Sequence, residues 1–251
     1  MVVRTPTSAT DPAAAGAALR ALLPESAHLV DGAPAAWLVS AAPEVLAGDL
    51  ALLVEPLGAG ELRVRIASTA SNDDSGREIW RLTVAVRDRP GLLASTAAVA
   101  SQHRLSIVSA RCATWNVEGL ALQQIHVVSG DLNLSGEPDW PWIGQDLRAA
   151  LTGGQTPITR FLPSGPATVT ISPEAGPGGR WRVKVDAPDA FGLLAALCRW
   201  LATAGANIEA AVVRSRGGAA GTVATDELVV SADPGFDRRA SELAEELSRP
   251  G

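Results

Sequence analysis

One stretch of the sequence occurs twice, first as Trp80-Arg-Leu-Thr-Val-Ala-Val-Arg-Asp-Arg-Pro-Gly-Leu-Leu-Ala94 and, 101 positions later, as Trp181-Arg-Val-Lys-Val-Asp-Ala-Pro-Asp-Ala-Phe-Gly-Leu-Leu-Ala195. Eight of the fifteen aligned positions are identical. The same offset aligns Leu105-Ser-Ile107 with Ala206-Asn-Ile208 without a gap. An internal repeat of this kind predicts two homologous structural units.

Each copy has the pattern of a strand, a helix, two strands and a second helix. Leu82, Val84 and Val86 alternate with polar or small residues, which is typical of a half-buried strand. Asp88-Arg-Pro-Gly91 ends the alternation, and apolar residues then recur at helical spacing. The further predicted strands are 62–67, 106–115, 120–128, 167–172, 207–215 and 222–230, and the last helix of each copy is predicted at 142–151 and 236–247.

The order predicts an α+β fold of two ferredoxin-like βαββα domains in tandem, residues 61–155 and 156–251. A strand–helix–strand crossover makes its two strands parallel, and the hairpin adds an antiparallel neighbour. We expect the helices to cover one face of each sheet. Residues 153–166 are predicted to link the domains. Residues 1–60 form an N-terminal helical extension with helices at 12–23 and 43–53, which either pack on the sheet or bind a partner.

Composition excludes several classes of protein. The chain has 47% hydrophobic and 19% charged residues, as soluble globular proteins do. Its net charge is −6 and its arginines are scattered, so we expect no nucleic-acid binding. No apolar run approaches the roughly 20 residues of a membrane span, and the first residues lack a signal peptide. We therefore expect a cytoplasmic protein, and the abundance of Ala, Gly, Pro and Arg suggests a bacterial one.

No residue pattern in the chain indicates catalysis. His28, His103 and His126 are not followed by Asp, and no Ser-His-Asp, metal-binding or Gly-rich phosphate motif is present. Cys112 and Cys198 lie in apolar segments and are expected to be buried thiols. We therefore expect a non-enzyme without metal or cofactor.

The segment Val86-Arg-Asp-Arg-Pro-Gly-Leu-Leu93 resembles the ACT domain family, whose members carry Asp-Arg-Pro-Gly-Leu-Leu where the first strand meets the first helix. The tandem copies, with Trp37-Leu-Val-Ser-Ala-Ala-Pro-Glu44 upstream, resemble the regulatory C-terminal region of the bacterial PII uridylyltransferases. The resemblance implies a βαββα fold and an amino-acid ligand, with glutamine the first candidate. The second copy departs from the motif, because Ala190 and Phe191 replace Arg-Pro.

The loop between first strand and helix is the predicted ligand site in each copy. Gly91 and Gly192 allow a ligand close to the main chain, and the amides that follow point from a helix N-terminus toward a carboxylate. Asp88 or Asp189 either accepts a hydrogen bond from an ammonium group or caps the helix. Arg89 is a candidate carboxylate partner through its planar fork, or is simply solvated.

In the ACT family, ligands often lie between two units, where they contact the loop of one unit and the start of the second strand of the other. The resemblance therefore implies that Ser106-Ile107 and Asn207-Ile208 also contact the ligand. Asn207 offers donors and an acceptor to an amino acid, or serves turn chemistry before the strand. We expect the two loops to be inequivalent, one of them being structural only. The candidate ligand-binding residues are Asp88, Arg89, Pro90, Gly91, Leu92, Ser106, Ile107, Asp189, Phe191, Gly192, Leu193, Asn207 and Ile208.

The sequence thus predicts a non-catalytic sensor that binds an amino acid, forms a homodimer and changes its affinity for a protein partner. Such coupling is reciprocal, so the partner would also change the affinity for the ligand. The alternative is a ligand-free interaction module in which sheet edges pair with a second copy or another protein.

Overall fold

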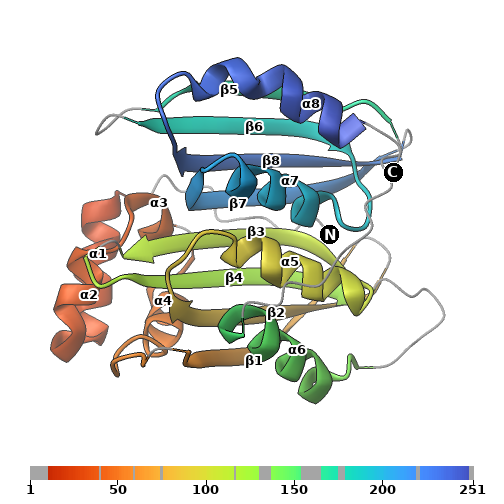
Figure 1. Cartoon of the computed structure of the whole chain (residues 1–251). Helices are drawn as coiled ribbons and strands as arrows, with labels where there is room; N and C mark the ends of the chain where they lie inside the picture. Colours follow the sequence, from red (N-terminus) through yellow and green to blue (C-terminus); the bar gives the residue numbers. More distant parts are fainter. Residues whose placement is uncertain are drawn as a thin grey trace.

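The computed structural model describes residues 11–39, 41–58, 60–73, 76–115, 117–129, 137–153, 165–174, 179–218 and 221–248. These residues have a mixed α+β architecture, with one antiparallel sheet of eight strands in the order β1-β2-β4-β3-β7-β8-β6-β5 (Figure 1). The strands are β1 (Leu62–Asn72), β2 (Glu78–Arg87), β3 (Leu105–Trp115), β4 (Leu120–Ser129), β5 (Thr168–Pro173), β6 (Arg180–Pro188), β7 (Asn207–Gly218) and β8 (Gly221–Ser231). The α-helices are α1 (Pro12–Leu22), α2 (Ala27–Asp31), α3 (Ala35–Leu38), α4 (Pro43–Leu50), α5 (Leu92–Gln102), α6 (Trp140–Thr152), α7 (Leu193–Thr203) and α8 (Ala240–Ser248).

The element order of the first repeat, β2-α5-β3-β4-α6, recurs in the second as β6-α7-β7-β8-α8. Val84 of β2 is paired with Gln123 of β4, and the equivalent Val185 of β6 is paired with Asp226 of β8. Gln123 and Asp226 are therefore equivalent, although the longer second hairpin shifts the alignment by two residues. At the centre of the sheet, β3 pairs antiparallel with β7 and joins the two repeats.

Helices α5, α6, α7 and α8 lie over one face of the sheet (Figure 1). The inward side chains of β2, Leu82, Val84 and Val86, are buried beneath them, as their alternation predicts. α5 and α7 lie side by side across the junction between the repeats, and a single apolar core runs beneath both. The junction is therefore held by packing as well as by the β3–β7 pairing.

The helices of the repeats cover one face of the sheet, as predicted, and the N-terminal helices cover the opposite face of the first repeat (Figure 1). Ala85, Leu122 and Trp115 point to this face and form a second core with α1–α4. The Trp115 indole N–H donates to the carbonyl of Leu29 at 2.7 Å. These contacts agree with the packing alternative for the extension. The predicted helices at 12–23 and 43–53 are observed as α1 and α4, with the shorter α2 and α3 between them.

Asp49 of α4 is fully buried and attaches this extension to the sheet. Its carboxylate accepts hydrogen bonds from Arg65, Arg81, Thr83 and Gln124 on three neighbouring strands. A buried carboxylate needs this many donors to offset its desolvation. The polar residues on this face of the sheet therefore have a partner in α4.

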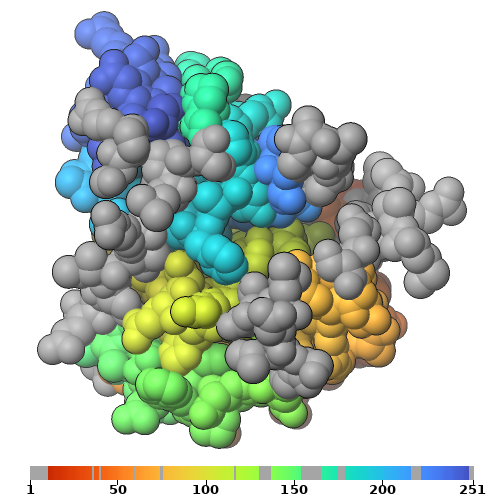
Figure 2. All heavy atoms as spheres, turned by 90° about the vertical axis from the view of Figure 1, so that its right-hand side faces the viewer, coloured from red at the N-terminus to blue at the C-terminus, as the bar shows by residue number. Residues whose placement is uncertain are grey.

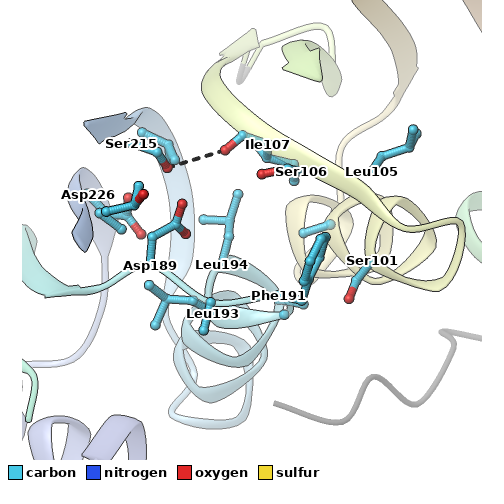
Figure 3. Close-up of a pocket in the computed structure, with 17 residues that line it drawn as sticks. Ser101, Leu105, Ser106, Ile107, Asp189, Phe191, Leu193, Leu194, Ser215 and Asp226 are labelled. Atoms are coloured by element: carbon cyan, nitrogen blue, oxygen red, sulfur yellow. Dashed lines mark hydrogen bonds between the residues drawn. The ribbon is translucent and has the colours of Figure 1, made fainter. Parts of the chain in front are cut away.

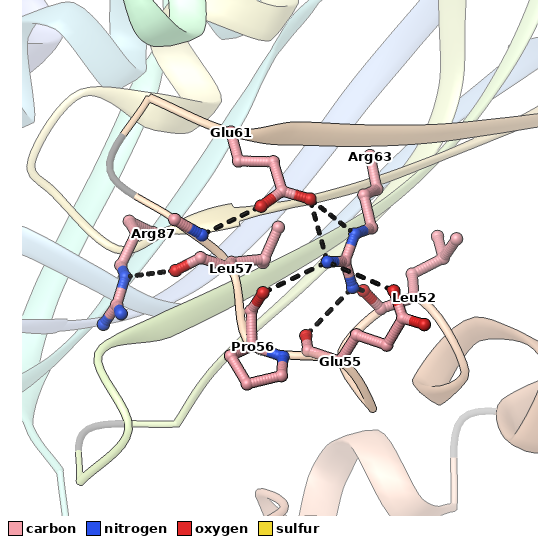
Figure 4. Close-up of polar contacts among 8 residues, drawn as sticks. Leu52, Glu55, Pro56, Leu57, Glu61, Arg63 and Arg87 are labelled. Atoms are coloured by element: carbon pink, nitrogen blue, oxygen red, sulfur yellow. Dashed lines mark hydrogen bonds and ion pairs between the residues drawn. The ribbon is translucent and has the colours of Figure 1, made fainter.

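The segment after α4 is held to β1 by Arg63 (Figure 4). Its guanidinium donates to the carbonyls of Leu52, Glu55 and Pro56 at 2.9–3.2 Å and pairs with Glu61. Three carbonyls that lie outside regular structure thereby acquire a donor.

Some predicted boundaries need correction. The strand predicted at 62–67 continues to Asn72 as β1, opposite β2. α6 begins at Trp140 rather than at residue 142, because the Asp139 side chain caps it and Pro141 suits its first turn. The helix predicted at 236–247 starts with a 3₁₀ turn, Phe236–Arg239, before α8.

Most of the predicted linker, residues 154–164, lies outside the described residues. No helix in the described residues combines the length and apolarity needed to cross a membrane.

Candidate functional site

Two equivalent loops lead from the first strand of each repeat into α5 and α7. Each ends in a left-handed glycine, Gly91 with φ +83° and Gly192 with φ +85°. Residues with a Cβ rarely adopt this conformation, which explains why glycine stands at both positions. The first amides of each helix have no acceptor within the helix and carry the positive end of its dipole.

The β3–β7 pairing sets the loop of each repeat against the start of the second strand in the other repeat. Residues 189–192 therefore lie near Leu105 and Ile107. In the same way, the first loop lies near Asn207 and Ile208 through Asp88, Arg89, Gly91 and Leu92. The two places are equivalent by the repeat and lie at opposite ends of the junction. The structure thus brings together the loop and strand residues that the resemblance to ACT domains places in one site.

The place formed by the second loop is a cavity of about 170 Å³, here called the open pocket. The β3 residues Ser106 and Ile107 and the end of α5 form one wall, and β7, β8 and the start of α7 form the other (Figure 3). Figure 2 shows this end of the junction, where the second repeat (cyan) meets the first (yellow). The lining residues central to its chemistry are Ser101, Ser106, Asp189, Phe191, Ser215 and Asp226.

Two carboxyl groups lie together at one end of the open pocket (Figure 3). Asp189 accepts hydrogen bonds from the Ser215 hydroxyl and the Ala190 amide, but burial raises its pKa above the usual range. Asp226 is 1% exposed, and its Oδ1 has no hydrogen-bond partner among the described residues. Burial, with smaller contributions from Asp189 and Asp186, raises the pKa of Asp226 to about 7.

The other end of the open pocket is less polar. Phe191 is about half exposed, at 51%, and lies near Ser101 of α5 in the close-up (Figure 3). Leu193, Leu194 and Ala195 begin α7 and line the pocket, so the N-terminus of this helix belongs to its wall. The Leu193 amide itself donates to the carbonyl of Ala190 at 3.1 Å. The site therefore combines two carboxyl groups, hydroxyl groups and a helix N-terminus.

The equivalent place at the first loop is nearly filled and is here called the closed cavity. Its volume is about 20 Å³, roughly the room for one water molecule. Asn207 hydrogen-bonds to Asp88, where the open pocket has the shorter Ser106 beside Asp189. Cys198 lines the closed cavity, where the open pocket has Ala97. Larger side chains at two equivalent positions thus accompany the difference in volume.

Twelve of the thirteen predicted ligand residues are divided between these two places. Arg89 lines the closed cavity, but its guanidinium donates to the carbonyls of Ala150 and Leu151 at the end of α6. The positive charge of Arg89 therefore lies at the C-terminus of α6, where the helix dipole favours a cation. Pro90 lines neither place and lies in a groove between α5 and α7. The open pocket contains Ser106, Ile107, Asp189, Phe191, Gly192 and Leu193, and the closed cavity contains Asp88, Arg89, Gly91, Leu92, Asn207 and Ile208.

Sequence reasoning missed Asp226 and Ser215. A signal for Asp226 was present, because it lies two residues from Ala224 and from Leu228, on the side of β8 that faces the core. An acidic residue in such an alternation is a buried ionisable group and marks a functional candidate.

Other titratable groups of the described residues do not form a second site. The thiols of Cys112 and Cys198 are free, and burial raises the pKa of Cys112 to about 12. No three His, Cys, Asp or Glu side chains within the described ranges are grouped as a metal would require.

No protein-family model matches the sequence, and no curated protein matches it either. Among solved structures, an aspartate kinase from Synechocystis is similar at 16% identity and a TM-score of 0.39, over 66% of this chain. The match spans only 25% of the kinase chain. An unknown protein from Galdieria sulphuraria is similar at 18% identity and a TM-score of 0.23, over 74% of this chain and 90% of its own. Both TM-scores lie below 0.5.

Proposed function

We propose that the chain is a non-catalytic, ACT-like sensor that binds a free amino acid in the open pocket. The observation that carries this proposal is a cavity with carboxyl groups at one end and a helix N-terminus in its wall. A zwitterion has complementary groups, since its carboxylate suits the amides of α7 and its ammonium suits Asp189. The repeat order and the motif at Asp88 support the ACT-like assignment.

The size and lining of the open pocket favour a small ligand. A cavity of about 170 Å³ is smaller than most drug-sized sites. Leu194 and Ile107 offer apolar contacts, and Ser101 and Ser106 offer hydroxyl groups that could bond a side-chain amide. Glutamine is therefore the first ligand to test.

Regulation follows in this proposal from the position of the pocket between repeats. A ligand that contacts both walls stabilises one arrangement of the two repeats over others. If a protein partner or a second copy binds that arrangement more tightly, the ligand changes the affinity of the chain for it. The alternative is a ligand-free interaction module that pairs through the edge strands β1 and β5, the strands at the two ends of the sheet.

A thermal-shift screen against the twenty amino acids, followed by calorimetry of each hit, tests the proposal. A ligand at about 100 times its Kd adds roughly 2.7 kcal/mol of stability, which is readily measured. We expect a selective shift that Ser106→Asn abolishes, because asparagine there would fill the open pocket as Asn207 fills the closed cavity. The control is Ser71→Asn at an exposed position of β1. A flat screen, or a shift unchanged by Ser106→Asn, would favour the interaction module.

A further inference from the structure

Asp226 and Gln123 occupy equivalent positions but differ in how their polar atoms are satisfied. The Gln123 side-chain oxygen accepts a hydrogen bond from the Thr96 hydroxyl at 2.7 Å. In the second repeat Leu197 stands at the position of Thr96, so Asp226 has no such donor. The first repeat thus has a neutral, paired amide where the second has a buried, unpaired carboxyl oxygen.

The charged surroundings of Asp226 are acidic. Asp189, in the loop before α7, and Asp186, on β6, act electrostatically on Asp226, and so does the Cys198 thiol of α7. Within the described residues, no arginine or lysine lines the open pocket. An ionised Asp226 therefore has no cationic partner among the described residues that line the pocket, and an unpaired buried charge is costly.

We infer that the open pocket selects a ligand with a primary ammonium group, which enters between Asp226 and Asp189, and that its entry displaces one proton from the Asp226 carboxyl to solvent. The inference deepens the proposed function by naming the ligand group that the site recognises. An ammonium group supplies three N–H donors and a positive charge, so it meets both the unpaired oxygen and the acidic surroundings.

The proton release makes binding depend on pH. Asp226 has a pKa of about 7 before ligand binds, so it is largely protonated at pH 6. Each unit of pH below 7 then weakens binding by about tenfold, because one proton competes with one ligand. Above pH 7 the affinity levels off until the ligand's own amino group loses its proton.

The test uses the whole purified chain and titration calorimetry with three sets of probes. The first set is the twenty amino acids, the second is their N-acetyl forms, which lack the positive charge, and the third is aliphatic amines without a carboxylate, such as 1,4-diaminobutane. Titration at pH 6 in two buffers with different heats of ionisation measures the protons released.

We expect an amino acid to bind with release of close to one proton, and its N-acetyl form to bind roughly tenfold more weakly or not at all. Asp226→Asn should weaken binding by roughly tenfold or more and abolish proton release. Asp237→Asn, at an exposed site, is the matched control and should change neither.

The remaining outcomes show which of the two claims, the ammonium inference or the proposed function, is wrong. Equal binding of an N-acetyl form in the open pocket would overturn the ammonium inference and leave an amino-acid-like ligand. Binding of amines but of no amino acid would overturn the proposed function and support the inference. Failure of all three sets to bind would overturn both.

Discussion

Asn207, at the start of β7, hydrogen-bonds across the repeat boundary to Asp88, whereas Ser106 at the equivalent position of β3 leaves the open pocket beside Asp189. The hydrogen bond between Asn207 and Asp88 is therefore one reason why the closed cavity is smaller than the open pocket. In the closed cavity the chain supplies its own partner for the loop aspartate. In the open pocket Asp189 accepts a hydrogen bond from the Ser215 hydroxyl of its own repeat, and Oδ1 of the neighbouring Asp226 has no partner among the described residues.

Replacing Asn207 should therefore destabilise the chain. Asn207→Ser removes the donor from the half-buried Asp88, whose pKa burial already raises. We expect a loss of about 1–3 kcal/mol in the free energy of unfolding, measured by urea denaturation, as for other hydrogen bonds to charged groups. Asn72→Ser, at the exposed end of β1, is the control. Equal stability of the two variants would show that the contact contributes nothing.

Asp226 should make the chain less stable as pH rises. Its pKa is about 7 in the folded state and about 3.9 in an unfolded chain. The stability due to the protonated carboxyl is thus fully present below pH 4 and is lost as pH rises through 7. The loss is of the order of 4 kcal/mol. Urea denaturation of wild type and Asp226→Asn between pH 4 and 8 measures it as a difference, and a constant difference would refute the assignment.

His126 should have the opposite effect over much of the same range. Burial, with the charges of Arg111 and Arg81, lowers its pKa to about 4, and its Nδ1 lies 2.9 Å from the Ser109 hydroxyl. An unfolded histidine titrates near 6.5, so stability is present above about pH 6.5 and is lost as pH falls toward 4, by up to about 3 kcal/mol. His126→Gln should remove this acid sensitivity in the same denaturation series. Persistence of the sensitivity would assign it to other groups.

Asp49 should be needed for attachment of the N-terminal extension. Asp49→Asn removes two ion pairs, with Arg65 and Arg81, while keeping the size of the side chain. We expect a loss of about 3 kcal/mol in the free energy of unfolding, since the arginines lose their buried partner. Trp37 contacts Trp115 across this interface, so tryptophan fluorescence should report any detachment. The control is Glu44→Gln on the exposed side of α4; a similar effect there would contradict a specific role for Asp49.

Much of the sheet could be predicted because its signals are local. The alternation around Val84 and the glycines at 91 and 192 determine strand, turn and helix start within a few residues. Because the sequence repeats, the elements assigned in the first copy also apply to the aligned positions of the second. The position of the N-terminal extension could not be predicted, because the partners of Asp49 are spread over three strands and only the folded sheet brings them together.

The candidate site was predictable in part for the same reason. The loop is aligned by the repeated motif, so Asp189 could be named from the sequence, and Ser106 could be named because the resemblance to ACT domains implies a site at the start of that strand. The size of each cavity depends on packing between repeats, which no local pattern reports. The alternation marks Asp226 as buried, but only the folded sheet places its side chain beside Asp189 at the pocket.

The most direct test of the central claim is the stoichiometry of amino-acid binding, measured by titration calorimetry on the purified chain. With one open pocket and one closed cavity, saturation should occur at one ligand per chain, and Ser106→Asn should abolish the heat of binding. Two equivalent ligands per chain, or full binding by Ser106→Asn, would contradict the account.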